Sequence, residues 1–173
     1  MCLDGAKGDR EVWLGDFFHA AKLIPVSTSR NDHITGTLSF VLDRQIANGP
    51  LPINALMGQP VDYPDLSAAS GLGLADYQIL GLLAFHTYVL QSGDIEYAAA
   101  TWPKWKRQID WMMSYVDNST HLVTFSGFLG DANGTAVSAL LVQGLNSAAT
   151  VASILDNPVV SKYTSAAATI ANE

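Results

Sequence analysis

The chain has 173 residues, of which 49% are hydrophobic and only 14% are charged, and its net charge is −7. This length suits one domain with a hydrophobic core, and we expect a single domain over residues 1–173. The low charged fraction leaves little polar surface, so the chain is either buried within something larger or exposes apolar faces. The negative charge argues against nucleic acid and membranes as partners, because few basic side chains are present to neutralise phosphates.

Cys2 is the only cysteine, which excludes an internal disulfide and a cysteine-based metal site. The first residues have neither a basic region nor an apolar run, so no signal peptide is predicted and the compartment is left open. Two sequons, at Asn118 and Asn133, permit N-glycosylation if the chain is secreted.

Turn-forming residues separate six segments of helical length along the chain. In chain order, these segments are 16–30, 34–48, 72–91, 94–117, 135–155 and 158–171. The most apolar stretch, 72–90, contains Asp76, which favours a buried helix over a membrane span. Only the run 121–125 is a weak strand candidate. We therefore predict an all-α fold.

The predicted helices alternate in character. The second, fourth and sixth segments carry apolar residues on one side, as amphipathic helices do. The first, third and fifth are apolar nearly all round and must be covered on every side. An α/α toroid has this alternation, because each of its inner helices is covered by an outer partner. A closed toroid of the common kind has six hairpins, so the three predicted here form a partial (α/α)6 toroid. Trp102 and Trp105, at helical spacing, are predicted to be core residues.

Polar residues concentrate in the segment Asp4–Asp16, which holds four acids, two bases and a tryptophan. Three glycines in this segment favour a loop that runs into the first buried helix. Cleavage of a sugar requires such a set, because one carboxyl protonates the leaving oxygen while others bind the hydroxyls. The alternative is a solvated acidic loop in which Asp16 caps the helix.

The same segment resembles the signature of fungal-type α-L-rhamnosidases, which are extracellular six-hairpin glycosidases. The matching positions are Asp4-Gly5-Ala6-Lys7, Asp9-Arg10, Trp13 and Gly15-Asp16. The resemblance continues more loosely through Ala75-Asp76-Tyr77 and Ser92-Gly93-Asp94. The catalytic domain of that family is an (α/α)6 barrel, which agrees with the alternation of helices.

The resemblance implies roles for six residues. Asp9 corresponds to the general acid. Asp76 is a weaker candidate for substrate contact, and its alternative role is that of a plain acid at a helix start. The residues implied in substrate binding are Asp4, Arg10, Trp13, Asp16 and Asp76. No metal-ligand spacing joins the four histidines and no phosphate-binding loop is present, so neither a metal nor a cofactor is predicted.

Two departures from the family pattern bear on activity. Gly8 replaces an arginine, which removes a positive charge beside Asp9. Inversion also needs a second carboxylate, roughly 6.5–9.5 Å from the acid. The family takes it from a later part of the barrel, and none of the glutamates in this chain suits the role: Glu11, Glu96 and Glu173. Asp131, in the glycine-rich stretch 127–134, is interpreted as a turn residue, with substrate contact as the alternative.

The sequence thus predicts a fragment of an α-L-rhamnosidase that binds a carbohydrate and is inactive without the remainder of its barrel. Three alternatives stay open. The chain is a non-catalytic or degenerate relative that binds sugar, an α/α-toroid glycosidase with another sugar specificity, or an all-α interaction module.

Overall fold

The computed structural model describes residues 2, 11–55, 57–58, 75–127 and 130–173. Helices dominate this part of the chain, with bounds Leu14–Ser27 (α1), Asn31–Leu42 (α2), Ala75–Ser92 (α4), Ile95–Met113 (α5), Thr135–Ile154 (α6) and Val160–Ala171 (α7). The strands are short: Val12–Trp13 (β1), Asn54–Ala55 (β2), Thr124–Gly127 (β3) and Gly130–Asn133 (β4). The all-α prediction is confirmed, and each predicted helical segment overlaps one helix.

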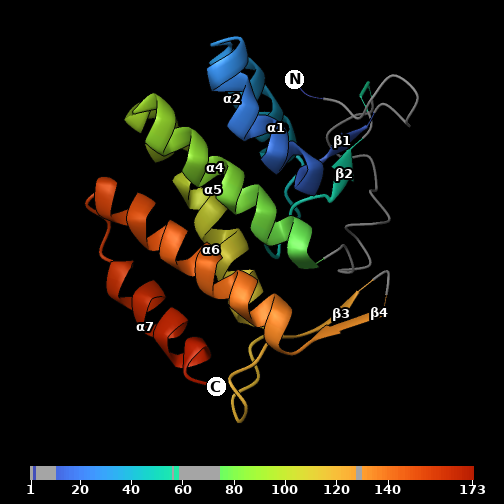
Figure 1. Ribbon diagram of the computed structural model, residues 1–173, viewed down its shortest axis with the longest axis vertical. Coiled ribbons are helices and arrows are strands. Elements are labelled where there is room, and N and C mark those ends of the chain that lie inside the picture. Colours follow the sequence, from blue (N-terminus) through green and yellow to red (C-terminus); the bar gives the residue numbers. More distant parts are fainter. Residues whose placement is uncertain (1, 3–10, 56, 59–74, 128–129) are drawn as a thin grey trace.

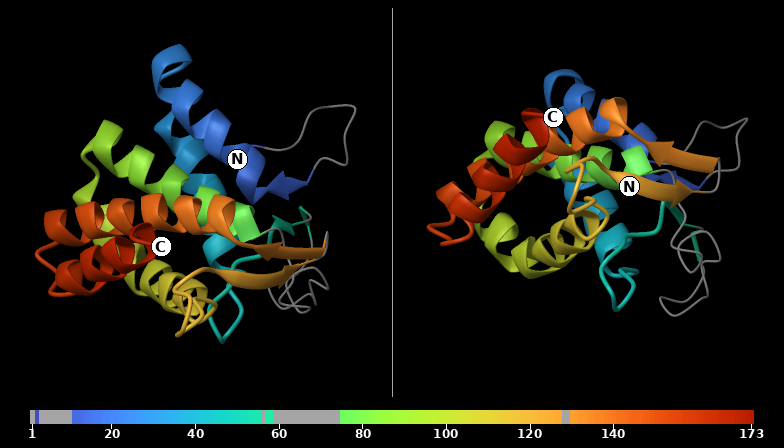
Figure 2. Two further views of the ribbon diagram at one scale, coloured as in Figure 1. Left: turned by 60° about the horizontal axis from the view of Figure 1, so that its bottom comes forward. Right: turned by 90° about the horizontal axis from the view of Figure 1, so that it is seen from below.

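The helices form three antiparallel hairpins, α1–α2, α4–α5 and α6–α7 (Figure 1). Helices α1, α4 and α6 lie side by side in one layer, and α4 packs between the other two. Helices α2 and α5 lie behind this layer in Figure 1, while α7 packs along α6. The turned views in Figure 2 show the same arrangement. One helix of each hairpin therefore belongs to a common layer and its partner covers it, as in part of an α/α toroid.

The turn between α4 and α5 shows how individual residues determine where one helix ends and the next begins. Gly93 adopts φ +66°, a left-handed conformation that glycine takes without steric cost. The side chain of Asp94 then caps α5, because its Oδ1 accepts a hydrogen bond from the N–H of Tyr97 (3.0 Å). Such a cap satisfies one of the N–H groups that a helix start leaves unpaired.

Aromatic side chains fill the core between the layers. Phe85 of α4 stacks on Trp105 of α5, with ring centroids 4.8 Å apart and planes at 15°. Trp102 of α5 meets Tyr163 of α7 at a steep angle, with centroids 6.5 Å apart. Trp102 and Trp105 are 5% and 0% exposed, so their prediction as core residues is confirmed.

A buried amide fixes the segment that precedes β2. The Gln78 side chain accepts from the N–H of Leu51 (3.1 Å) and donates to the C=O of the same residue (2.6 Å). Gln108 of α5 donates in turn to the backbone C=O of Gln78 (2.7 Å). Because both backbone groups of Leu51 are satisfied within the core, the chain enters β2 at a fixed place on α4.

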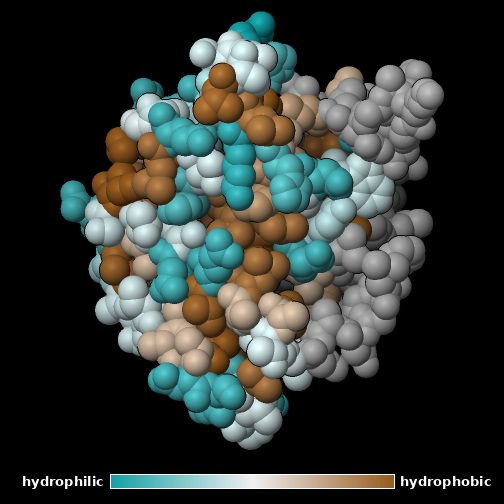
Figure 3. Space-filling view, viewed as in Figure 1, coloured by the Kyte–Doolittle hydropathy of each residue, from teal (hydrophilic) through white to brown (hydrophobic). Residues whose placement is uncertain are grey.

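The prediction that the first, third and fifth helices are covered on every side is wrong. Leu23 and Val26 of α1 are 64% and 79% exposed, and Leu90 of α4 is 54% exposed. On α6, the exposed stripe consists of Ala136, Ala139, Gln143, Asn146 and Thr150. Within the described residues no further element packs over these positions. Figure 3 looks onto this layer and shows hydrophobic side chains lying among polar ones.

The strands also depart from the predictions. The weak strand candidate 121–125 overlaps β3, which pairs antiparallel with β4. Asp131 lies in β4 opposite Ser126, so its interpretation as a turn residue is wrong. The end of the predicted acidic loop forms β1 and the start of α1, because β1 pairs with β2. Two-residue strands of this kind are created by tertiary packing and leave no alternating pattern in the sequence.

Among the helices of the described residues, α6 is the one long and apolar enough to cross a membrane. In this fold 56% of the apolar stretch of α6 is buried against other elements, as in a core helix of a globular protein. The stretch 72–90, assigned from sequence to a buried helix, forms most of α4, and that helix is buried along much of its length.

Candidate functional site

The helices α1, α4 and α6 begin at the same end of the molecule, where all four strands also lie (Figure 1). We call this end the strand end and define it by residues 11–16, 53–55, 75–77, 124–127 and 130–135. The opposite end, with the helix connections at 28–30, 93–94 and 155–159, is the turn end. Helix N-termini present unpaired N–H groups and a partial positive charge. The strand end therefore contains three helix starts, with Asp16 in the first turn of α1 and Asp76 in the first turn of α4.

Three of the six predicted site residues lie in the described part of the chain, and they are Trp13, Asp16 and Asp76. The other three, Asp4, Asp9 and Arg10, lie outside the described residues, and so does Gly8. The structure therefore bears on three of the predicted binding residues and not on the predicted general acid.

The fold holds the residues on both sides of segment 3–10. Before it, the N–H of Cys2 donates to Oγ1 of Thr37 on α2 (2.8 Å). After it, the carboxylate of Glu11 accepts a hydrogen bond from the side-chain amide of Asn54. Cys2 is thus attached to α2, and Glu11 is attached to β2.

A short antiparallel ladder continues this attachment into α1. Val12 lies opposite Ala55 and Trp13 opposite Asn54. The next N–H, that of Leu14, donates to the C=O of Ile53 (2.8 Å). This ladder fixes the direction in which the chain enters α1, and it starts the helix at Leu14, two residues before the predicted start at 16.

Asp16 lies in the first turn of α1 and is exposed. The N-cap position belongs to Trp13, so the alternative in which Asp16 caps the helix is wrong. The carboxylate of Asp16 has a tertiary partner instead, since its Oδ2 accepts a hydrogen bond from Oη of Tyr77 on α4 (2.8 Å). A carboxylate near a helix N-terminus is also stabilised by the helix dipole.

Tyr77 is the residue of this site that the sequence did not identify. Its ring meets Trp13 edge to face, with centroids 6.3 Å apart and planes at 90°. The same ring lies against the backbone of Gly15, where an added Cβ would be 2.4 Å from Cδ1 of Tyr77. Sequence interpretation chose the neighbouring Asp76, at the start of a buried helix. The available signal was Gly15, because a glycine in the first turn of a helix indicates a close neighbour.

A second glycine allows the same two helices to pack closely. A Cβ on Gly81 of α4 would lie 2.7 Å from the side chain of Leu14 on α1. Each helix thus offers a glycine where the other presents a large side chain. This close packing of α1 on α4 determines the position of Asp16 relative to Tyr77.

Asp76 occupies the first turn of α4 with an exposed side chain. In the described part of the chain its side chain forms no hydrogen bond or ion pair. Its charge suits the positive end of the helix. Its role in substrate contact stays a prediction.

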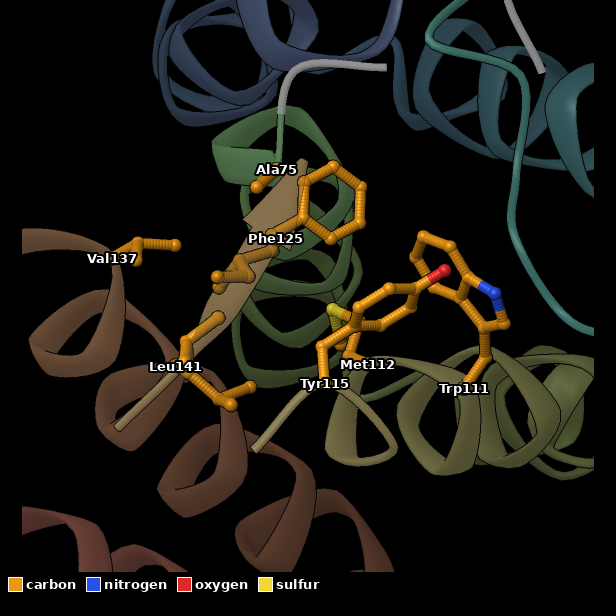
Figure 4. A pocket seen from close by; sticks show the side chains of 9 residues that line it. Ala75, Trp111, Met112, Tyr115, Phe125, Val137 and Leu141 are labelled. Atoms are coloured by element: carbon orange, nitrogen blue, oxygen red, sulfur yellow. The ribbon is translucent and has the colours of Figure 1, made fainter. Parts of the chain in front are cut away.

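An apolar pocket lies close to the strand end but does not suit a sugar. Its walls come from α4, α5, β3, α6 and the residues beside them (Figure 4): Ala75, Ile79, Trp111, Met112, Tyr115, Val123, Phe125, Val137 and Leu141. Its free volume of about 20 Å³ has room for about one water molecule. A sugar needs polar partners for its hydroxyls, so this pocket is a gap in the core packing.

Within the described residues, no group of three or more His, Cys, Asp or Glu side chains is placed to hold a metal ion. His86 of α4 is half buried, and burial lowers its pKa, which favours the neutral imidazole. A lone histidine in an apolar helix is more often a core residue than a metal ligand, and this state of His86 agrees with that role.

No protein-family model matches the sequence, and no curated protein matches it. Among solved structures, the fold is similar to that of a rhamnosidase from Klebsiella oxytoca with rhamnose bound, with a TM-score of 0.78 and 21% sequence identity. The match covers 97% of this chain and 33% of the rhamnosidase chain. At this identity the likeness shows the fold alone. The chain is therefore rhamnosidase-like in fold and spans about a third of the length of the rhamnosidase that it matches.

Proposed function

We propose that this chain is part of a glycoside hydrolase that removes terminal α-L-rhamnosyl units with inversion of configuration. The observation that carries the proposal is the likeness, over 97% of the chain, to a rhamnosidase with rhamnose bound. The strand end adds support, because Asp16 supplies an oriented hydrogen-bond acceptor beside the aromatic rings of Trp13 and Tyr77.

In this proposal Asp9 is the general acid. Its proton passes to the glycosidic oxygen as the bond from that oxygen to the anomeric carbon breaks, and the aglycone leaves as a neutral alcohol. A water molecule attacks the anomeric carbon from the opposite face and loses its proton to a second carboxylate. That carboxylate comes from outside residues 1–173, in the remainder of the barrel.

The other predicted residues bind the sugar. Aspartate carboxylates accept hydrogen bonds from the rhamnose hydroxyls, the indole of Trp13 packs against an apolar face of the ring, and Arg10 orients the acids. The residues with these roles are Asp4, Arg10, Trp13, Asp16 and Asp76.

The test uses the full-length gene product and an aryl α-L-rhamnoside. We expect release of the aryl alcohol, with β-L-rhamnose as the first sugar product in the NMR spectrum. Asp9→Asn removes the proton donor and lowers kcat by about 10²–10⁴-fold. The matched control is Asp156→Asn at the turn end, where asparagine tolerates the φ of +50° and activity is unchanged. Full activity of Asp9→Asn would contradict the assignment of the acid.

Residues 1–173 alone are expected to release no aryl alcohol, because the second carboxylate is absent. Turnover by this chain alone would show that it contains its own base. Rhamnose binding by the full-length product without hydrolysis would favour the degenerate sugar-binding relative. Hydrolysis of a different glycoside would favour an α/α-toroid glycosidase of another specificity.

A further inference from the structure

Tyr77 contacts three residues at the N-cap and in the first turn of α1. Its hydroxyl donates to Asp16, its ring lies against Gly15, and the edge-to-face contact joins it to Trp13. Two of these residues, Trp13 and Asp16, are among the three predicted sugar-binding residues in the described part of the chain. Tyr77 therefore connects them, although it belongs to a different helix.

The hydrogen bond leaves Asp16 with free acceptor capacity. A carboxylate has two oxygens with about four lone-pair sites. Tyr77 occupies Oδ2, and the described residues place no donor on Oδ1. An exposed aspartate samples several rotamers, so a fixed donor on one oxygen restricts the direction of the other.

We propose that Tyr77 is a positioning residue for the sugar: it orients the carboxylate of Asp16 and the indole of Trp13 so that both reach one rhamnose ring. The proposal rests on the proposed function. The position of Tyr77 is itself determined by the close packing of α1 on α4, where Gly15 and Gly81 leave no room for a Cβ.

The neighbouring Asp76 is less suited to this role. It is exposed and forms no contact with Trp13 or Asp16 among those that the structure describes. Tyrosine is a neutral donor with few rotatable bonds, so it orients a carboxylate without cancelling the negative charge. Tyr77→Phe removes the hydroxyl and keeps the ring, which isolates the effect on Asp16 from the contacts with Gly15 and Trp13.

Tyr88 provides a matched control, because it lies on the same helix at the turn end. Its hydroxyl also donates to an aspartate, Oδ2 of Asp94 (2.6 Å). Tyr88→Phe therefore removes the same kind of hydrogen bond away from the sugar site.

The experiment compares wild-type full-length product, Tyr77→Phe and Tyr88→Phe, using L-rhamnose titrations in a calorimeter and steady-state kinetics. We expect Tyr77→Phe to weaken rhamnose binding and to raise KM by about three- to tenfold, the effect of one lost hydrogen bond to a ligand-binding group. Its kcat changes less than its KM. Tyr88→Phe keeps the wild-type Kd and KM, although it lowers the thermal stability.

A double-mutant cycle separates positioning from a general structural effect. If Tyr77 acts through Asp16, the double variant Asp16→Asn with Tyr77→Phe binds rhamnose no more weakly than Asp16→Asn alone. Additive losses, or unchanged binding by Tyr77→Phe, would overturn the role of Tyr77 while leaving the proposed function intact. A wild-type protein that neither binds L-rhamnose nor hydrolyses the rhamnoside would overturn both proposals.

Discussion

Helix α4 carries a tyrosine near each end whose hydroxyl donates to an aspartate. At the strand end, Tyr77 donates to Asp16, a residue 61 positions away on another helix. At the turn end, Tyr88 donates to Asp94, only 6 positions along the chain. The two pairs have the same chemistry and similar lengths, 2.8 Å and 2.6 Å.

The two aspartates differ in how many of their carboxylate oxygens accept hydrogen bonds within the fold. Asp94 also accepts from the N–H of Tyr97 through Oδ1, so the fold uses both of its oxygens to close a turn. Asp16 is exposed and gives one oxygen to Tyr77. The same pair of side chains therefore completes the structure at one end and leaves an acceptor for a ligand at the other.

The largest expected effect is the loss of stability when a glycine is replaced, which we expect to be greater at the strand end than at the turn end. Gly15→Ala forces a Cβ against the ring of Tyr77, and we expect it to lower the free energy of unfolding by about 1–3 kcal/mol. It should also abolish the tenfold or smaller advantage that Tyr77 gives in rhamnose binding. Gly93→Ala at the turn end meets open space but adopts φ +66°, and it should cost about 1 kcal/mol.

Urea unfolding and rhamnose titrations of both glycine variants measure this difference. Gly93→Ala should bind rhamnose as the wild type does. A Gly15→Ala protein with wild-type stability and binding would show that α1 and α4 do not need the close contact.

A smaller effect distinguishes the aspartates themselves. Asp94→Ala removes a helix cap and is expected to lower the free energy of unfolding by about 1 kcal/mol. Asp94→Asn should retain most of this stability, because asparagine also caps helices. Asp16→Ala, at an exposed position, should stay within about 0.5 kcal/mol of the wild type. If urea unfolding shows the same loss of free energy of unfolding for both alanine variants, then Asp94 and Asp16 contribute equally to stability. The proposed difference between them would then be wrong.

The smallest effect concerns alkaline pH. Burial, with the hydrogen bond to Asp94, raises the pKa of Tyr88 to about 12. An unfolded tyrosine has a pKa of about 10. A raised pKa means that this contribution to stability is complete below about pH 10 and is lost as pH rises towards 12. Tyr88→Phe should therefore lose stability less steeply over this range in urea unfolding. An unchanged slope would mean that the Tyr88 hydroxyl does not contribute.

Much of the fold follows from local sequence. The Ser92-Gly93-Asp94 turn was predicted because glycine and aspartate have conformational and capping preferences of their own. The helices followed from apolar periodicity between such turns. The exposed stripe of α6 was missed, because its alanines and threonine scarcely interrupt an apolar pattern.

The site was less predictable, since its contacts join distant segments. Asp16 was expected in the right place, at the start of a buried helix, but its partner lies on α4 and nothing in one sequence pairs the two. The Leu14–Ile53 hydrogen bond likewise moved the helix start and gave the N-cap position to Trp13. The roles of Asp4, Asp9 and Arg10 stay predictions, because these residues lie outside the described part of the chain.

The packing of Gly15 against Tyr77 also has a consequence for the order of assembly. Asp94 and Tyr88 can meet as soon as their hairpin turn forms, because the loop between them is short. Asp16 is synthesised before Tyr77, and its hydrogen bond requires a residue made 61 positions later. During synthesis, the contact of Asp16 with Tyr77 therefore forms only after α4 has left the ribosome.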